Sequence, residues 1–352
     1  MNNSKLRVLI TLPDLNMTGG VVGLFNILRL NTTFEGVDYF IIHNRMPKML
    51  RLIYKYFKFA VIIRKYDVIH INPSLNIKSF LRDSVFSLLT ILFEKKLLVY
   101  WHGWDNSFEE KLHKNIYFKY ILRITFLKAQ TTIVLGQLFK EKLELLGYKN
   151  TIYIETNTAE DNYIENIKSK TIESNKPIRL LFLSRLEIEK GVYIAIDTLK
   201  LLNKDGVKYT LTIAGSGTEE ENIRSIISNI NAIEYLGNIS GKNKHEVLVN
   251  SDIMFFPTFY PEGLPLTLLE ALMYGMPIIT RPVGGIPDII TNKNGFITDS
   301  LDPKEFVEII NNLCSDTKYF NEMSINNLAY SSNFKPAIVR NRIYKYYSEL
   351  VL

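Results

Sequence analysis

Two series of short, β-rich runs constrain the fold of this chain more than any other feature. The first series comprises KLRVLITL, VDYFIIH, DVIHINPS, KKLLVYWHG, TTIVLG and TIYIETN; the second comprises IRLLFLSR, KYTLTIAG, AIEYLGNIS, DIMFFPT, MPIITRPVGG and NGFITD. Helix-compatible stretches separate the runs within each series. Strands that alternate with helices form parallel sheets covered on both faces. The sequence therefore predicts two doubly wound α/β domains, in agreement with a length of 352 residues.

A polar stretch, EDNYIENIKSKTIESNKP, separates the two series and ends just before a strand. We therefore expect one Rossmann-like domain at residues 1–160, a linker at 161–177 and a second Rossmann-like domain at 178–333. Residues 334–352 are expected to form a helix that packs back on the first domain. Because ligands bind at the carboxyl ends of strands in open α/β sheets, we expect the functional residues in a cleft between the two sheets.

The charge of the chain is unevenly distributed. Residues 1–160 contain 22 Lys and Arg against 13 Asp and Glu, whereas the remaining residues contain 20 against 23. A basic half indicates an anionic partner; nucleic acid is not expected, because no nucleic-acid-binding motif accompanies the charge. The single cysteine, Cys314, is typical of a reducing cytoplasm. The amino-terminal apolar run ends in Pro13 and Asp14 and reads as a first strand rather than a signal peptide.

The most informative segment is TFYPEGLPLTLLEALMYGMPIITRPVGGIPDII, residues 258–290. Glu262 lies in a loop after an apolar run, and Pro265 sits where the first turn of a helix is expected. Backbone N–H groups after Glu262 would then lie at a helix N-terminus, which attracts anions. Glu270 falls in a largely buried helix, where its carboxylate needs hydrogen-bond donors, and ligand hydroxyls could supply them. A charge at a helix N-terminus for Glu262 and a structural hydrogen bond for Glu270 are the alternatives.

A second motif, LLFLSRLEIEKG, places two cations in a loop between a strand and a helix. The guanidinium of Arg185 can donate to two phosphate oxygens at once, while the ammonium of Lys190 supplies a point charge. Together they suit a diphosphate, whose growing negative charge fixed cations stabilise when its bond to another group breaks. The alternative is a pair of solvated surface cations.

The spacing of Glu262 and Glu270, together with the later Gly-Gly-Ile-Pro at residues 284–287, resembles the signature of glycosyltransferase family 4. That family comprises retaining enzymes of the GT-B fold, in which two Rossmann-like domains face each other across a cleft. The resemblance implies that Glu262 contacts the donor sugar near the reacting carbon and that Glu270 binds the nucleotide ribose. It assigns Arg185 and Lys190 to the donor phosphates. It also places the intervening backbone near sugar and phosphate, at Gly263, Leu264, Leu266 and Thr267.

The resemblance extends more weakly to the first domain. Gly20 belongs to the loop TGGVVG after the first run, where the family has a glycine-rich loop that faces the donor phosphates. His102, in YWHGWD, resembles a histidine that contacts the donor sugar in related members, although a hydrogen-bonded structural histidine is the alternative. Asn157, in IETNT, resembles the asparagine that ends the family's first domain. The other four histidines have no such context and are expected to be structural or at the surface.

Some common catalytic patterns are missing from the sequence. It contains no Asp-x-Asp pair to grip a divalent metal, no Cys/His cluster with zinc-ligand spacing and no Gly-x-Ser-x-Gly motif. We therefore expect a metal-independent enzyme without a cofactor, for which the nucleotide-diphosphate sugar is a co-substrate. By resemblance, the second domain binds this donor and the first binds the acceptor.

The sequence thus predicts a retaining glycosyltransferase that transfers a sugar to a glycan or lipid-linked acceptor, as in the biosynthesis of surface polysaccharides. A nucleotide-sugar epimerase of the same fold is one alternative; it would need acid and base groups at the sugar ring, and only His102 is a candidate. A catalytically silent partner subunit is the other. The motif residues Arg185, Lys190, Glu262 and Glu270 argue against it, because a silent copy does not need all four.

One further segment indicates a peripheral membrane protein at the inner face of a membrane. Residues 48–65, KMLRLIYKYFKFAVIIRK, contain no acidic residue. In a helix, Lys48, Arg51, Lys55, Lys58 and Lys65 share one sector, and an unrelieved cationic face attracts anionic lipids. The opposite side, which we expect to pack on the sheet, comprises Met49, Ile53, Tyr56, Phe57, Ala60 and Ile63. The alternative is that the cations are merely solvated.

Overall fold

Each of the twelve β-rich runs contains one strand, and the strands form two six-stranded parallel sheets. The prediction of two doubly wound α/β domains is therefore confirmed. The structure is a computed structural model that describes residues 6–16, 19–42, 48–173, 175–204, 208–261 and 263–352, except for the side chains of residues 42 and 48–52. The chain divides into unit 1, which holds residues 1–158, 261–264 and 336–352, and unit 2, which holds 159–260 and 265–335.

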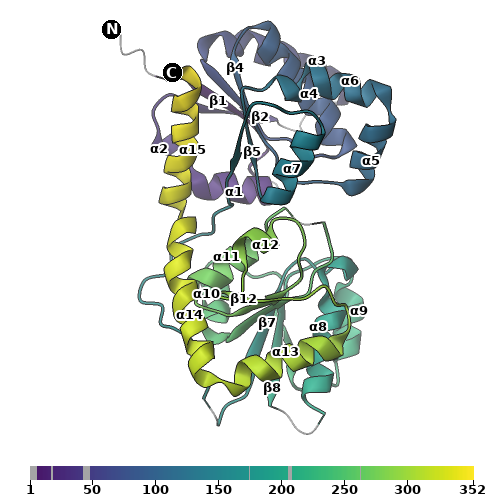
Figure 1. Ribbon diagram of the computed structural model, residues 1–352, viewed down its shortest axis with the longest axis vertical. Coiled ribbons are helices and arrows are strands. Elements are labelled where there is room, and N and C mark those ends of the chain that lie inside the picture. Colours follow the sequence, from purple (N-terminus) through teal and green to yellow (C-terminus); the bar gives the residue numbers. More distant parts are fainter. Residues whose placement is uncertain (1–5, 17–18, 43–47, 174, 205–207, 262) are drawn as a thin grey trace. The chain divides into compact units, whose positions relative to one another are not determined.

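The sheet of unit 1 has the order β2-β1-β3-β4-β5-β6 (Figure 1). Its central strands are buried and apolar, as expected when helices cover both faces. The strands are β1 (Val8–Pro13), β2 (Val37–Ile42), β3 (Val68–Ile71), β4 (Lys96–Tyr100), β5 (Thr131–Val134) and β6 (Thr151–Ile154).

Helices cover this sheet on two faces. Right-handed crossovers place α3, α4 and α6 side by side on one face, with α1 and α15 on the other (Figure 1). The helices of unit 1 are α1 (Gly20–Leu28), α2 (Leu30–Thr33), α3 (Lys48–Ile62), α4 (Ile77–Leu92), α5 (Asn106–Lys114), α6 (Ile116–Ile124), α7 (Gln137–Leu145) and α15 (Pro336–Val351), with 3₁₀ turns η1 (Ile63–Lys65) and η2 (Phe126–Lys128).

Unit 2 repeats the plan with the order β12-β11-β10-β7-β8-β9. Its strands are β7 (Ile178–Leu183), β8 (Tyr209–Ala214), β9 (Ile233–Tyr235), β10 (Ile253–Phe256), β11 (Ile278–Thr280) and β12 (Gly295–Ile297). Its helices are α8 (Val192–Leu202), α9 (Glu220–Ile227), α10 (Gly241–Asn250), α11 (Leu266–Met273), α12 (Ile286–Ile289), α13 (Pro303–Ser315) and α14 (Thr317–Ser331), with 3₁₀ turns η3 (Ile188–Lys190) and η4 (Ser332–Phe334).

Short polar side chains fix where several helices begin. An Asn or Asp at the N-cap accepts a hydrogen bond from a free backbone N–H of the first turn, which stabilises a helix by about 1 kcal/mol relative to alanine. Helices α4, α5, α6, α13 and α14 begin in this way, at Asn76, Asp105, Asn115, Asp302 and Asp316.

Residues 48–65 form α3 followed by η1, so the expected helix is confirmed. Its expected apolar face is partly wrong, because Ile53 and Phe57 are 66% and 69% exposed. The buried side is narrower and is formed by Phe59 and Ile63, with Tyr56 half-buried beside them. A helix in an outer layer buries only the strip that faces the sheet, and α3 has more apolar side chains than this strip can hold.

Lys170 anchors the loop between β6 and β7 within unit 2. The backbone N–H of Lys170 donates to Ser324 Oγ at 2.6 Å, and its ammonium donates to the carbonyl oxygens of Leu248 and Val249 at 3.1 and 2.6 Å. Burial lowers the pKa of Lys170 to about 8. The carbonyl groups at the end of α10 thus bind the Lys170 ammonium and fix the position of this loop.

No helix in the described part of the chain is both long and apolar enough to cross a bilayer.

Candidate functional site

The two cations of the LLFLSRLEIEKG motif lie where expected, in the connection between β7 and α8. Arg185 follows the carboxyl end of β7 and is exposed. Lys190 is the last residue of η3 and is 5% exposed. Gly191 has a φ of 84°, and a Cβ there would lie 2.2 Å from the carbonyl oxygen of Pro257. Only glycine fits this left-handed turn, which therefore fixes the direction in which Lys190 leaves the backbone.

Both cations contact one aromatic ring that the sequence did not reveal. The Nζ atom of Lys190 lies 4.0 Å from the ring centroid of Tyr260, and Cζ of Arg185 lies 5.6 Å from it. Residues 185–190, which carry the two cations, are called the cation loop below. The backbone of Tyr260 is hydrogen-bonded to this loop, because the N–H groups of Phe259 and Tyr260 both donate to the carbonyl of Glu189. Cation–π attraction thus holds the two positive groups on the faces of one side chain.

Two glycines of GSGTEE pack against the same loop. A Cβ on Gly215 would lie 1.8 Å from the carbonyl oxygen of Ser184, and a Cβ on Gly217 would lie 2.3 Å from that of Leu186. Because Gly215 and Gly217 have no side chains, the turn after β8 can lie close to the loop that carries Arg185.

Helix α11 begins at Leu266, one residue later than predicted, with Pro265 at its N-cap. The side chains of Leu266 and Thr267 are half-buried, and their backbone N–H groups lie in the first turn, which lacks intrahelical acceptors. The helix dipole makes this end partially positive. Glu262 lies outside the described residues.

Glu270 lies in α11, is 7% exposed and already has a partner. Nζ of Lys244, on α10, lies 2.5 Å from its Oε1. Burial raises the pKa of Glu270, while Lys244 opposes the shift. The ligand hydroxyls that we expected as partners would therefore have to share this carboxylate with Lys244, a residue that sequence reasoning missed.

In unit 1, His102 follows β4 and is held in one orientation by residues from two further strands, β3 and β1. Asn72 follows β3, and its Nδ2 donates to the carbonyl oxygen of Thr11 on β1 at 3.0 Å. The Oδ1 atom of Asn72 must then face Nε2 of His102, 2.7 Å away. Because an amide oxygen only accepts, Nε2 carries the proton and Nδ1 is left as an acceptor. Burial lowers the pKa of His102 to about 3, so the ring is neutral.

Gly263 and Leu264 belong to unit 1, and Gly263 lies beside this histidine. A Cβ on Gly263 would lie 3.0 Å from the carbonyl oxygen of His102 and 2.6 Å from the side chain of Leu135. Asn157 Nδ2 donates to the carbonyl oxygen of Leu264 at 2.7 Å. The structure thus brings Gly263, Leu264 and Asn157 together with His102, although they are far apart in sequence.

Gly20 is the first residue of α1 and is exposed. A Cβ there would meet no atom within 4 Å. No contact with the described part of the chain therefore requires glycine at this position.

The four histidines without a motif context include two with clear structural partners. His70 is fully buried and its Nδ1 lies 2.6 Å from the hydroxyl of Tyr347, while Nδ1 of His245 lies 2.8 Å from the hydroxyl of Tyr274. The interpretation of these two as structural is confirmed. Burial lowers the pKa of His70 well below its ordinary value.

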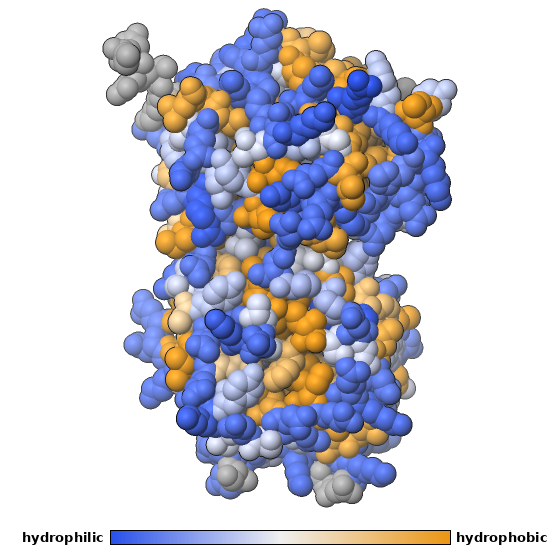
Figure 2. All heavy atoms as spheres, viewed as in Figure 1, coloured by the Kyte–Doolittle hydropathy of each residue, from blue (hydrophilic) through white to orange (hydrophobic). Residues whose placement is uncertain are grey.

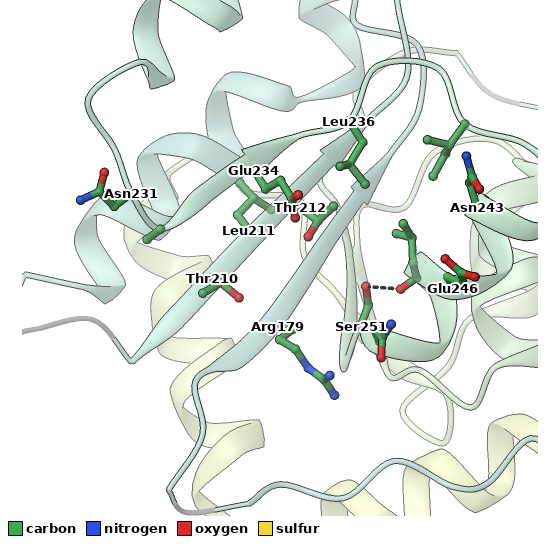
Figure 3. A pocket seen from close by; sticks show the side chains of 14 residues that line it. Arg179, Thr210, Leu211, Thr212, Asn231, Glu234, Leu236, Asn243, Glu246 and Ser251 are labelled. Carbon is green, nitrogen blue, oxygen red and sulfur yellow. Dashed lines mark hydrogen bonds between the residues drawn. The ribbon is translucent and has the colours of Figure 1, made fainter.

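A pocket of about 740 Å³ lies elsewhere in unit 2 (Figure 3). It is lined by residues near the amino-terminal ends of β7, β8 and β10, among them Arg179, Thr210 and Ser251. Arg179 is engaged by Asp252, with Nη2 2.7 Å from Oδ1. Since Arg185 and Lys190 follow the opposite, carboxyl end of β7, this pocket does not contain the predicted site.

Solved structures resemble the whole chain. The crystal structure of Alr3699/HepE from Anabaena in complex with UDP covers 98% of this chain with a TM-score of 0.75 at 17% identity. The lipopolysaccharide outer core galactosyltransferase WaaB covers 96% with a TM-score of 0.70. These likenesses establish the fold, which is GT-B, with two Rossmann-like domains.

Among curated proteins, the chain is 25% identical over 233 residues to the amylovoran biosynthesis glycosyltransferase AmsK of Erwinia amylovora, which is 63% of this chain and 56% of AmsK. It thus spans little more than half the length of that relative. Residues 163–329 match the family model described as "Glycosyl transferases group 1". That range contains the loop of Arg185 and Lys190 together with Tyr260, Lys244 and Glu270, and this part of the chain belongs to the glycosyl transferases group 1 family.

Proposed function

We propose that the chain is a retaining glycosyltransferase that moves a sugar from a nucleotide-diphosphate sugar to a glycan or glycolipid acceptor in surface polysaccharide biosynthesis. AmsK is named for the biosynthesis of amylovoran, and a 41.2 kDa Klebsiella pneumoniae protein from a cps region is 26% identical over 72% of this chain. A UDP-sugar is the first donor to test, because HepE was solved with UDP and with UDP-glucose.

The observation that carries this proposal is the pair Arg185 and Lys190 around the ring of Tyr260. Lys190 is 5% exposed, so an anionic ligand at its amino group would be screened little by water, and the attraction between them would be stronger than at an exposed site. The exposed guanidinium of Arg185 can add a forked contact to phosphate. The first N–H groups of α11, at Leu266 and Thr267, provide further donors for an anion in the same unit.

The remaining roles follow the family resemblance. Glu262 contacts hydroxyls of the donor sugar, and the backbone at Gly263 and Leu264 lies near the sugar and phosphate. Glu270 accepts hydrogen bonds from the ribose while it retains Lys244. From unit 1, Gly20 leaves room for the donor phosphates. His102 accepts a hydrogen bond from a sugar hydroxyl through Nδ1, in keeping with its neutral ring.

In the proposed step, the acceptor hydroxyl oxygen bonds to the anomeric carbon on the face that the leaving group departs from. The bond from that carbon to the β-phosphate oxygen breaks through an oxocarbenium-like state. The phosphate oxygen takes the acceptor's proton, so the products are the glycoside and the nucleoside diphosphate. The protein contributes positioning and charge stabilisation, since the two carboxylates of the motif serve sugar and ribose rather than acting as nucleophiles.

The test combines binding with a donor-only incubation. UDP-, GDP- and ADP-sugars are screened for thermal stabilisation, because a ligand at about 100 times its Kd stabilises the native state by about 2.7 kcal/mol. The stabilising donor is then incubated with the protein alone. Slow hydrolysis is expected. Formation of an epimer would instead identify an epimerase, and absence of both binding and turnover would identify a silent subunit.

The proposal includes peripheral attachment of the protein to the cytoplasmic face of an anionic membrane through residues 48–65. Lys58 and Lys65 are exposed, and no acidic residue interrupts this segment. Each basic residue near an anionic leaflet contributes about 1 kcal/mol of salt-sensitive attraction. A variant with Lys48, Arg51, Lys55 and Lys58 changed to glutamine should sediment less with anionic vesicles at low salt. Equal sedimentation of the two proteins would refute this attachment.

A further inference from the structure

The outer surfaces of α4 and α6 carry apolar side chains where a soluble helix has polar ones. On α4, Ile77, Leu81 and Leu92 are 45%, 42% and 67% exposed. Val85 and Leu88 are half-buried between them, and all five side chains fall within about 80° of the helix circumference. On α6, Ile116, Tyr117 and Tyr120 are 70%, 76% and 61% exposed.

Helices α4 and α6 are neighbours, and α3 packs against the side of α4 that faces away from α6. The ring of Phe80 on α4 contacts that of Phe118 on α6, with 6.1 Å between centroids. The hydroxyl of Tyr56 on α3 donates to the carbonyl of Arg82 on α4 at 3.2 Å. The exposed apolar residues of α3 therefore extend the same surface: Ile53, Tyr54, Phe57 and Val61. Figure 2 shows part of unit 1's surface, where orange residues stand among blue ones near the top of the view.

A pocket of about 1070 Å³ lies beside α6 on this surface. Its walls are apolar, with Leu112, Ile116 and Leu127 among them, and Leu145 at its edge is 83% exposed. Four exposed cations line it together with His113, and none of the four makes an ion pair within the described part of the chain: Lys119, Arg123, Lys128 and Lys149. None of the described residues that line it is an Asp or a Glu.

The three helices of this surface carry mostly positive charge. The sequences of α3, α4 and α6 contain eight Lys and Arg and one carboxylate, Asp83. Asp83 is buried and its Oδ2 lies 2.6 Å from Nη2 of Arg82, so it contributes little negative potential outside. A surface whose helices are both apolar and predominantly cationic complements the boundary between anionic headgroups and acyl chains.

We propose that the α4–α6 surface inserts shallowly into an anionic phospholipid bilayer, with a lipid phosphate headgroup held in the pocket beside α6. This deepens the proposed membrane attachment and rests on it, but it does not depend on glycosyl transfer. Tyr117 and Tyr120 suit the interface, where an apolar ring meets a hydroxyl that remains hydrated. The four cations of the pocket, which have no carboxylate partner among the described residues, face phosphates at headgroup level.

The same charge distribution argues against a second copy of the chain as the occupant. In a two-fold dimer built on this surface, each copy would present the same cationic patch to the other. Like charges facing each other across an interface are strongly unfavourable. Lipid phosphates relieve these charges, and a second copy does not.

The experiment separates insertion from electrostatic attachment by the use of salt. In about 0.5 M NaCl the screening length is only about 4 Å, so attachment by charge alone is lost while insertion remains. The apolar variant changes Ile116, Tyr117 and Tyr120 to serine. A matched control changes three exposed apolar residues in unit 2 to serine: Ile226, Leu301 and Ile325. Sedimentation with vesicles of phosphatidylcholine containing phosphatidylglycerol is measured in low and high salt.

We expect the wild type and the control to remain partly bound in high salt, and the apolar variant to bind roughly 10-fold less. A Tyr117→Trp variant supplies a reporter that does not depend on affinity. Its emission should shift to the blue and be quenched by brominated lipid, whereas that of a Tyr319→Trp control in unit 2 should not change. Equal high-salt binding of the wild type and the apolar variant would overturn the proposal, as would an unshifted emission of the Tyr117→Trp variant on vesicles.

Thermal unfolding and donor-induced stabilisation are recorded for every variant. Donor stabilisation that persists in a variant unable to bind vesicles shows that donor binding is intact and separates it from membrane binding. Self-association of wild type, without vesicle binding, would replace the lipid by a second copy and refute the proposal.

Discussion

At the scale of single residues, the ring of Tyr260 decides how the two phosphate-binding candidates are presented. Arg185 and Lys190 could be read from the sequence, because a cationic loop after an apolar strand is a local pattern. Tyr260 could not, because it comes from the loop after another strand, β10, and meets the cations only through the fold. Asn72 and Lys244 escaped detection for the same reason, since their partners are 30 and 26 residues away in sequence.

Replacing either cation tests its role in stabilising the leaving diphosphate. Arg185→Ala or Lys190→Ala should lower the rate of transfer by roughly 10²-fold or more, if the lost contact resembles one oxyanion-hole donor. Lys200→Ala is the matched control, since Lys200 lies on the same unit in an exposed pair with Asp197. Near-normal turnover of both site variants, with the fold intact, would refute the assignment.

The neutral state of His102 gives a prediction about pH. Its pKa is lowered to about 3 by burial, so the ring stays neutral through the working range and Nδ1 remains an acceptor. The rate of transfer should therefore show no acid limb from His102 between about pH 5.5 and 8, although a free histidine titrates near 6.5. The check is a pH profile of kcat/KM for wild type and His102→Gln. A limb near pH 6 that disappears in the variant would contradict this view.

At the scale of elements, helix α15 shows how a terminal segment is anchored by buried polar contacts. Nη2 of Arg342 lies 2.7 Å from Oε1 of Glu155, which follows β6 and is 2% exposed, and its Nε donates to the other carboxylate oxygen at 2.8 Å. The rings of Tyr346 and Tyr153 stack beside them with centroids 4.0 Å apart. The strands and most helices followed from periodicity, whereas these contacts depend on side chains about 190 residues apart.

Breaking that ion pair should destabilise unit 1. Arg342→Met leaves the buried carboxylate of Glu155 without its guanidinium, which costs on the order of 3 kcal/mol for a buried pair. Lys345→Met on the same helix removes only an exposed pair with Glu349 and should cost less than about 1 kcal/mol. Urea unfolding of the three proteins measures both effects. An Arg342→Met variant as stable as Lys345→Met would show that the anchor contributes nothing.

Helix α3 shows where prediction from periodicity stops. An amphipathic pattern specifies that some apolar residues face inward, but not how wide the buried strip is. Ile53 and Phe57 share the apolar side with Ile63, yet only Ile63 is buried. The width depends on the neighbouring helix α4, whose outer strip is also apolar, and no pattern within α3 reveals that neighbour.

At the scale of the whole molecule, the two units differ in what their sequences disclose. The family model covers residues 163–329, where the proposed contacts to phosphate and ribose require particular residue types at fixed spacing. Unit 1 was predicted as a doubly wound sheet from strand alternation alone, and its basic charge reflects a surface rather than a motif. Its candidate site residues Gly20 and His102 rested on single short segments. The hydrogen bonds of Asn72 and Asn157 that organise this region required the structure.

The positive groups of unit 2 lead to the last prediction, which is that transfer does not need a divalent metal. The diphosphate of a nucleotide sugar requires neutralisation as it leaves, and a bound metal is the usual alternative to protein cations. Here the sequence has no Asp-x-Asp pair, while Arg185, Lys190 and the amino end of α11 supply positive charge in one unit. Transfer, or hydrolysis of donor when no acceptor is present, should keep most of its rate in EDTA. Complete loss of that rate, restored by added Mg²⁺, would show that a metal neutralises the leaving group instead.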